Sequence, residues 1–309
     1  MSLTTKGRIV LGLMGTLERL HLAPSLEKVI ASPMEKRLAS APSRGMLGTV
    51  VDVPIEDHQV RMRDGAEIRV RVYRPAGATV PLLYAHGGGF CVGGIMACDH
   101  ICRRLAVESG AVVASVEYRL APEHPFPGPL NDVVDSLEWF QSEELDWDRL
   151  VVAGDSAGGN LAAALALVLR DRGTPLAGQL LVYPILDLTI SGAGALGYRG
   201  PGMKAKDGRV CADAYLQGHD PRDPLASPLH APDLSGTAPA LVITVEHDAL
   251  REEGGLYAER LRKADVPVTL VDVAGHVHAS LSLPVLYRGI DELYARMTSF
   301  VQRPGLVQA

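Results

Sequence analysis

The feature that most constrains this chain is a serine between two glycines, at the junction of a predicted strand and a predicted helix. Apolar residues lead into the Gly-x-Ser-x-Gly pattern centred on Ser156, and an Ala- and Leu-rich run from Leu161 to Arg170 follows. Strand and helix pass close to each other at such a turn, and Gly154 and Gly158 leave room for that approach. The free amide of Ala157 and the helix dipole favour negative charge beside the serine hydroxyl. The pattern predicts a nucleophilic serine, and a Gly/Ser turn that only starts a helix is the plainer alternative.

Size and charge limit the class of protein further. The chain has 309 residues and is 47% hydrophobic, enough for one large core with a smaller accessory part. Its net charge of -6 argues against a nucleic-acid surface and predicts no particular partner. No apolar run approaches the roughly 18 residues that span a bilayer, so we expect no stable membrane insertion. The short stretch Ile9 to Leu17 is interpreted as a peripheral amphipathic helix rather than a signal peptide, because Glu18 and Arg19 follow it directly.

Four scattered cysteines, Cys91, Cys98, Cys102 and Cys211, are too few for a disulfide scaffold. Cys98 and Cys102 lie four apart on a predicted helix with His100 between them, but a zinc site would need further ligands at suitable spacing. We interpret the cysteines as core or surface thiols of a cytoplasmic protein.

The order of predicted elements indicates an α/β fold. A hairpin of strands 50–56 and 66–73 comes first, with a turn at Asp64-Gly65. Short apolar strands, of the kind buried on both faces of a sheet, then alternate with helices. The predicted strands are 82–85, 111–117, 150–153, 180–183, 240–245 and 268–273, and the predicted helices are 96–108, 130–140, 161–170, 253–263 and 285–301. This alternation predicts a mostly parallel, doubly wound sheet.

Two regions fall outside the alternation. Residues 1–45 are predicted to form proline-broken helices with Leu13, Leu17 and Leu20 on one face. About fifty residues, including a predicted helix at 212–217, replace the usual short crossover between the strands at 180 and 240. We predict that 1–45 and 185–225 form a cap, and that 46–184 and 226–309 form the two parts of an α/β core.

A serine hydroxyl becomes a nucleophile when a base takes its proton and an acid orients the base. Asp248 follows one predicted strand and is preferred as the acid on position. The alternatives are Glu246, Asp187 and Asp272. His276 and His278 both follow the next predicted strand, and their positions alone leave the choice of base open. The order serine, acid, histidine agrees with the strand-turn-helix setting of the serine.

A run of glycines follows another predicted strand, in His86-Gly-Gly-Gly-Phe90. Consecutive glycines let several backbone amides converge on one small space, where they can receive the oxyanion of a tetrahedral intermediate. A phosphate-binding loop would end in Gly-Lys-Ser/Thr, which the following residues 91–94 do not supply. With the serine turn present, we favour an oxyanion hole.

Three segments in this order, His86 to Phe90, Tyr118 to Glu123 and Gly154 to Asn160, resemble the hormone-sensitive lipase family of α/β-hydrolases. This is bacterial esterase family IV, in its Gly-Asp-Ser-Ala-Gly branch, and the resemblance runs from about residue 80 to the carboxyl terminus. It implies an α/β-hydrolase fold with a helical cap. It also implies these site residues: Ser156 as nucleophile, Asp248 as orienting acid, His278 as base, and the amides of Gly88, Gly89 and Ala157 as the oxyanion hole.

The function implied by the resemblance is that of a serine carboxylesterase that works through an acyl-enzyme, needs no metal or organic cofactor and forms a homodimer. A cap over the serine predicts a closed pocket, so we expect short to medium acyl chains of about four to eight carbons. The alternatives are an amidase or lactonase with the same triad, and a non-catalytic small-ligand receptor on the same fold. Three residues depart from the family pattern: Ala249 replaces a proline, Glu252 an aspartate and Ser280 a phenylalanine.

Overall fold

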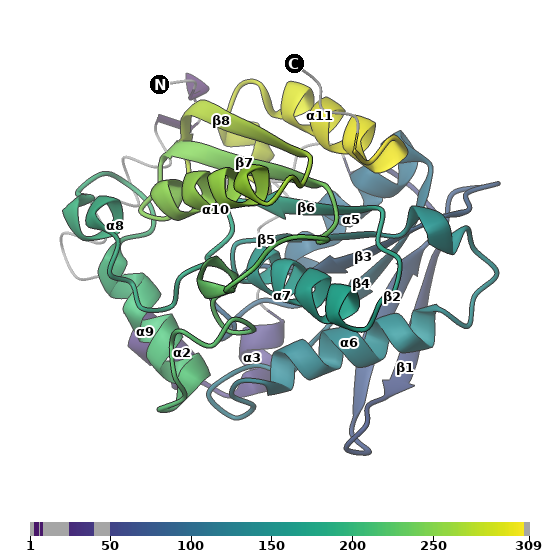
Figure 1. The fold of residues 1–309 in the computed structure, drawn as a ribbon, viewed down its shortest axis with the longest axis horizontal. Coiled ribbons are helices and arrows are strands. Elements are labelled where there is room, and N and C mark those ends of the chain that lie inside the picture. The colour runs from purple at the N-terminus through teal and green to yellow at the C-terminus, as the bar shows by residue number, and fades with distance from the viewer. Residues whose placement is uncertain (1–2, 6, 9–24, 40–49, 306–309) are drawn as a thin grey trace.

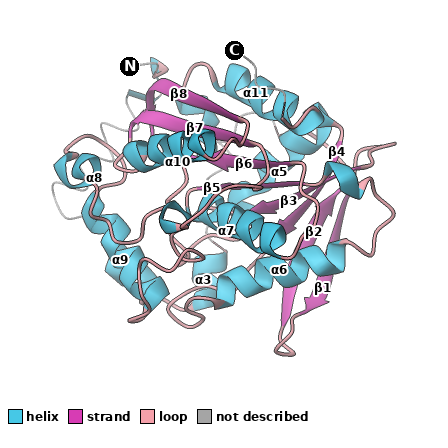
Figure 2. Ribbon diagram, viewed as in Figure 1, coloured by secondary structure: helices cyan, strands magenta, loops and turns pink. Residues whose placement is uncertain are grey.

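The computed structural model describes residues 3–5, 7–8, 25–39 and 50–305. Its centre is an eight-stranded sheet in the order β1-β2-β4-β3-β5-β6-β7-β8 (Figures 1 and 2). The strands are β1 (Ile55–Arg61), β2 (Glu67–Tyr73), β3 (Val80–Ala85), β4 (Ala111–Val116), β5 (Val151–Asp155), β6 (Gly178–Val182), β7 (Ala240–His247) and β8 (Val268–Val277). Strand β2 is antiparallel to β1 and β4, and the later pairs are parallel. The predicted mostly parallel α/β sheet is confirmed.

The bounds of the predicted first strand, 50–56, are wrong by five residues, because β1 spans Ile55–Arg61. The turn closes through hydrogen bonds between Met62 and both Gly65 and Ala66, so pairing continues directly into Arg61 opposite Glu67. Strand β1 lies at the edge of the sheet, and most of its side chains are polar and exposed. The prediction placed the strand on the β-branched residues that precede β1, because such residues are common in strands. An edge strand can be largely polar, since one of its sides is exposed to solvent.

Helices cover both faces of the sheet (Figure 1). One face carries α6 (Gly128–Phe140), α7 (Ala157–Asp171) and α10 (Arg251–Lys263), and the other carries α5 (Ile95–Ser109) and α11 (Ile290–Gln302). Strands β3 to β6 are buried along their whole length, and their side chains alternate between these two apolar layers. Burial on both faces explains why their sequences are apolar throughout.

Four shorter helices lie outside this alternation. They are α2 (Leu26–Ile30), α3 (Met34–Leu38), α8 (Ala193–Gly197) and α9 (Ala205–Leu216). Helices α8 and α9 belong to the long connection between β6 and β7, and α2 contacts α9 at the same end of the sheet (Figure 1). The helix predicted at 212–217 is the last part of α9. The predicted N-terminal face of Leu13, Leu17 and Leu20 lies outside the described residues, as does the stretch Ile9 to Leu17.

All four cysteines are buried free thiols. The sulfur of Cys98 lies 3.9 Å from that of Cys102 and 3.4 Å from the hydroxyl of Ser115, while His100 contacts the carbonyl of Leu281. Within the described ranges, no three metal-ligating side chains gather, and no helix combines the length and apolar character needed to cross a bilayer.

Candidate active site

The candidate site begins at the turn between β5 and α7. Ser156 has φ 53° and ψ -116°, a conformation that a non-glycine residue adopts only under constraint. A Cβ added to Gly154 would lie 2.3 Å from the carbonyl carbon of Gly158, and one added to Gly158 would lie 2.0 Å from the carbonyl oxygen of Ala85. The two glycines therefore have the role expected of them, because any side chain would push the strand and the helix apart.

Two loops at the carboxyl edge of the sheet bring a histidine and a carboxylate to this serine. His278 follows β8, and its Nε2 lies 2.9 Å from Ser156 Oγ. Its Nδ1 lies 2.7 Å from Oδ2 of Asp248, which follows β7. The other oxygen of Asp248 accepts a hydrogen bond of 3.0 Å from the amide of Leu250. With Nδ1–H donating to the carboxylate, Nε2 is left to accept the proton of the hydroxyl.

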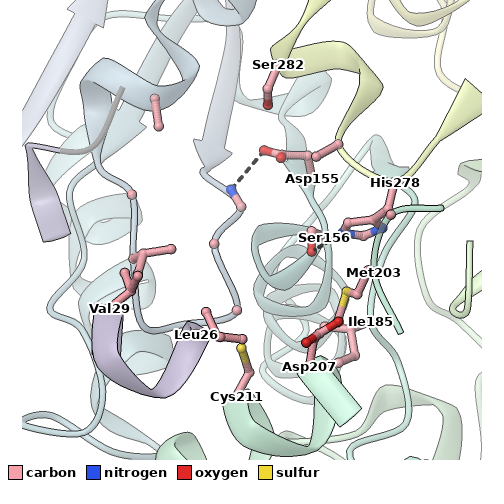
Figure 3. A pocket seen from close by; sticks show the side chains of 18 of the residues that line it. Leu26, Val29, Asp155, Ser156, Ile185, Met203, Asp207, Cys211, His278 and Ser282 are labelled. Carbon is pink, nitrogen blue, oxygen red and sulfur yellow. Dashed lines mark hydrogen bonds between the residues drawn. The ribbon is translucent and has the colours of Figure 1, made fainter. Parts of the chain in front are cut away.

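Two opposing effects set the charge state of His278. Burial alone disfavours the imidazolium, but the Asp248 carboxylate outweighs it, so the pKa of His278 is raised above its usual value. Asp155 lies within the same motif, and burial raises the pKa of its carboxyl although Tyr84 and the amide of Gly87 donate to it. Sequence reading gave Asp155 no role, yet its Oδ1 joins the serine turn to the start of the glycine run (Figure 3).

The structure separates the two candidate histidines. His276 lies two residues before His278 and points away from Ser156. Its Nδ1 contacts Ser280 Oγ at 3.1 Å. Its Nε2 donates to the carbonyl of Arg288 at 2.9 Å, because a carbonyl oxygen can only accept, and Nε2 is therefore the protonated nitrogen. Burial lowers the pKa of His276, in contrast to His278.

The alternative acids also lie elsewhere. Asp187 pairs with His230 at 3.0 Å, Glu246 accepts from the amide of Gly275 at 2.6 Å, and Asp272 accepts from Thr244 at 2.8 Å. Only Asp248, among the carboxylates weighed from the sequence, hydrogen bonds to His278 in the described chain.

Two departures from the family pattern have structural partners. Glu252 Oε2 accepts a 2.6 Å hydrogen bond from the amide of Gly194, which joins α10 to α8. Ser280 is the partner of His276 Nδ1 described above. Both side chains therefore make contacts that hold loops in place.

The glycine run forms a compact turn. The amides of Cys91 and Val92 both donate to the carbonyl of Gly88, and Gly88 and Gly89 have φ 132° and 58°. Among the described residues, the amides of Gly88, Gly89 and Ala157 find no hydrogen-bond acceptor. Unpaired amides beside a serine hydroxyl are what a developing oxyanion requires.

A cavity of about 960 Å³ contains Ser156, His278, Gly88 and Gly89 in its wall. Figure 3 shows Leu26 and Val29 of α2 on one side and Met203 and Asp207 on the other, with Cys211 just below Leu26. Most of the lining is apolar side chain and glycine backbone. The cavity therefore combines a hydrogen-bonded serine, converging amides and space for an apolar group.

Several known proteins are similar to this chain over most of its length. The family described as alpha/beta hydrolase fold has a model that matches residues 82–282. The chain is 35% identical over 298 residues to the carboxylic ester hydrolase LipN of Mycobacterium tuberculosis, and this alignment covers 90% of this chain and 78% of LipN. It is 35% identical over 275 residues to the ethyl acetate hydrolase of Pseudomonas putida, and this alignment covers 84% of this chain and 86% of that enzyme. The hyperthermophilic esterase of Pyrobaculum calidifontis has a similar structure, with a TM-score of 0.79 and 39% sequence identity. The superposition covers 84% of this chain and 88% of that esterase.

Proposed function

This chain belongs to the α/β-hydrolase family, in its hormone-sensitive lipase branch, and is a carboxylic ester hydrolase, and we propose that Ser156, His278 and Asp248 are its catalytic triad. The observation that carries this proposal is the unbroken line of hydrogen bonds from Asp248 through His278 to the Ser156 hydroxyl, which opens into the cavity. A line of this kind disfavours a non-catalytic receptor, because it serves to activate a nucleophile.

In the first half of the reaction, Ser156 Oγ attacks the ester carbonyl carbon while His278 Nε2 takes the hydroxyl proton. The carbonyl oxygen gains the negative charge and is bound by the amides of Gly88, Gly89 and Ala157. Asp248 keeps Nδ1 protonated and stabilises the imidazolium that forms. The helix dipole of α7 adds to the stabilisation, since its amino end lies at the serine.

Collapse of the tetrahedral intermediate breaks the bond to the alcohol oxygen, and His278 gives its proton to that leaving group. The acyl group stays on Ser156 Oγ. A water molecule then attacks the acyl carbon as His278 takes its proton, and the same amides hold the second oxyanion. Release of the carboxylic acid restores the serine.

The substrate range follows from the walls of the cavity. We propose that the described part of the segment 1–45 forms, with residues 185–225, a cap over a core that lies within residues 46–184 and 226–309. The contribution of α2 and α9 to the cavity wall supports this division. The relatives named above include a protein that acts on ethyl acetate. The chain hydrolyses short- to medium-chain acyl esters, with small-molecule esters as its partners.

The setting of the enzyme is also part of the proposal. It acts in the cytoplasm, in line with four unpaired thiols. It forms a homodimer. Within the described part of the chain, strand β8 pairs with β7 alone and lies at the edge of the sheet, where a strand of a second copy can pair with it.

The test is covalent labelling with diethyl p-nitrophenyl phosphate, which phosphorylates an activated serine and releases p-nitrophenol. We expect one phosphoryl group per chain, located on Ser156 by mass spectrometry, and loss of esterase activity in parallel. Ser156→Ala should take up no label and lose about 10⁶-fold in kcat, with an unchanged circular dichroism spectrum. Labelling of another serine, or a tenth of the activity in the variant, contradicts the proposal.

A further inference from the structure

Arg37, a residue of α3 that does not line the cavity, is fully enclosed despite its charge. Its Nε donates to the carbonyl of Ser32 at 2.9 Å, and its Nη1 donates to the carbonyls of Cys91 at 2.7 Å and Ala121 at 2.6 Å. Its Nη2 donates to both carboxylate oxygens of Glu123. These contacts satisfy the whole guanidinium fork, which fixes the side chain in one position.

The contacts of Arg37 converge on the loop of residues 88–93, here called the oxyanion loop. The carbonyl of Phe90 accepts from the amide of Ala121 at 2.9 Å, and the amide of Gly93 donates to the carbonyl of Arg37 at 3.0 Å. Within the described residues, the backbone hydrogen bonds that tie this loop to other segments all end on Arg37 or Ala121. Arg37 makes two of these attachments itself, to Cys91 and Gly93, and its bond to the carbonyl of Ala121 holds the residue that makes the third.

We propose that Arg37 is a positioning residue that aims the amides of Gly88 and Gly89 at the oxyanion. This inference rests on the function proposed above, which assigns the oxyanion to these amides. A run of glycines has little conformational preference of its own, so the direction of its amides has to be imposed from outside. Donors stabilise a transition state only when they are held at hydrogen-bond distance from the place where charge develops.

The charges of Arg37 and Glu123 favour a stable ion pair. Burial by itself opposes the charge of Glu123, but the hydrogen bonds from Arg37 lower the pKa of this carboxyl below its usual range. The charged form of the Glu123 carboxyl is therefore favoured beside the guanidinium. The segment that contains α3 is thus a part of the catalytic apparatus, in addition to any contact that the cap makes with substrate.

The experiment compares Arg37→Met and Arg37→Lys with a matched control. The control is Arg119→Lys, because Arg119 forms a similar ion pair with the fully buried Asp132 and makes no contact with the oxyanion loop. Each variant is measured for kcat and KM with p-nitrophenyl butyrate, for Tm, and for the inhibition constant of a trifluoromethyl ketone. This ketone adds to an active serine and places an oxyanion in the hole.

We expect kcat of Arg37→Met to fall about 10- to 100-fold while KM stays close to that of the wild type. The ketone should bind more weakly by a similar factor, because its adduct resembles the transition state. The kcat and the ketone affinity of Arg37→Lys should lie between those of Arg37→Met and those of the wild type, since an ammonium group can replace some of the contacts. Arg119→Lys should lower Tm and leave kcat and the ketone affinity unchanged.

Two results overturn the proposal: a kcat within about twofold of wild type in folded Arg37 variants, or a rise in KM alone, which indicates a role in substrate binding. If neither Arg37 variant folds, Glu123→Gln decides, since it weakens the hold on the guanidinium; an unchanged kcat there rejects the inference. Ser156→Ala, measured alongside, distinguishes a failure of the inference about Arg37 from a failure of the proposed function. If it remains active, the proposed function itself fails.

Discussion

The serine turn and the segment of α8 and α9 border the same cavity, yet they differ in how tightly their surroundings constrain them. Residues 151–167 are buried without interruption, and the glycines of the turn have no room for a methyl group. Residues 191–207 are mostly exposed or half-buried, and a Cβ added to Gly197 would meet nothing within 4 Å. From this difference we expect the turn to determine whether the reaction occurs, and the proposed cap to determine which esters react.

The largest effect we expect concerns the two histidines at the end of β8. His278→Ala should lose at least about 10⁴-fold in kcat, because the serine loses its base. His276→Ala should keep kcat within a few-fold and lower Tm, since it removes two buried hydrogen bonds but no contact with Ser156. Steady-state kinetics and thermal melts of both variants give the answer, and reversed activities would assign the base to His276.

The next effect tests the steric contrast directly. Gly158→Ala should destabilise the fold by at least about 3 kcal/mol, because its Cβ would overlap the carbonyl of Ala85. Gly197→Ala, the matched substitution in α8, should change the free energy of unfolding by less than about 1 kcal/mol. Urea unfolding measures both. Equal losses at the two sites would mean that the cap is as constrained as the turn.

The pH dependence provides a smaller effect. Protonated His278 cannot act as base, so kcat/KM should rise with pH as the imidazolium loses its proton. Because Asp248 raises the pKa of His278, the midpoint of this rise should lie above the usual value of 6.5. Asp248→Asn removes the carboxylate and leaves burial, which lowers the pKa, so the residual activity should have a more acidic midpoint. A midpoint that does not move would show that Asp248 leaves the charge of His278 unaffected.

The smallest effect concerns acyl length and belongs to the cap. With p-nitrophenyl esters from acetate to palmitate, kcat/KM should gain up to about fourfold per methylene that is buried, peak at about four to eight carbons and then fall. Met203→Ala enlarges the cavity wall and should move the peak to longer chains, while Leu196→Ala, at an exposed position outside the lining, should not. Emulsified triolein should be a poor substrate, and strong hydrolysis of it would reject this interpretation of the cap.

Sequence reasoning succeeded where one physical requirement dominates. Strands buried on both faces, such as β3 and β5, were located to within two residues at each end because nothing but apolar side chains fits there. The edge strand β1 was misplaced because its polar residues carry no such signal. The fold and the carboxylesterase function expected from the three motifs are confirmed, and the site residues stay predictions.

The parts that sequence could not supply depend on contacts between distant segments. The choice between His276 and His278 depends on how the chain turns at the end of β8, which periodicity does not report. Arg37 is a charged residue in a short helix, and a typical charged residue is exposed. Apart from Ser32, its partners lie 54 to 86 positions away, so only the folded structure identifies it as buried.

The position of β8 at the far edge of the sheet has a consequence for synthesis of the protein. Ser156 and the oxyanion loop leave the ribosome long before His278, and β8 has only β7 to pair with. A chain that folds from its amino end during translation can therefore build the serine turn while its hydroxyl still lacks a base. With His278 as the proposed base, we expect hydrolytic activity to begin only when the last strand docks, so that the nascent chain is inactive on esters until it is nearly complete.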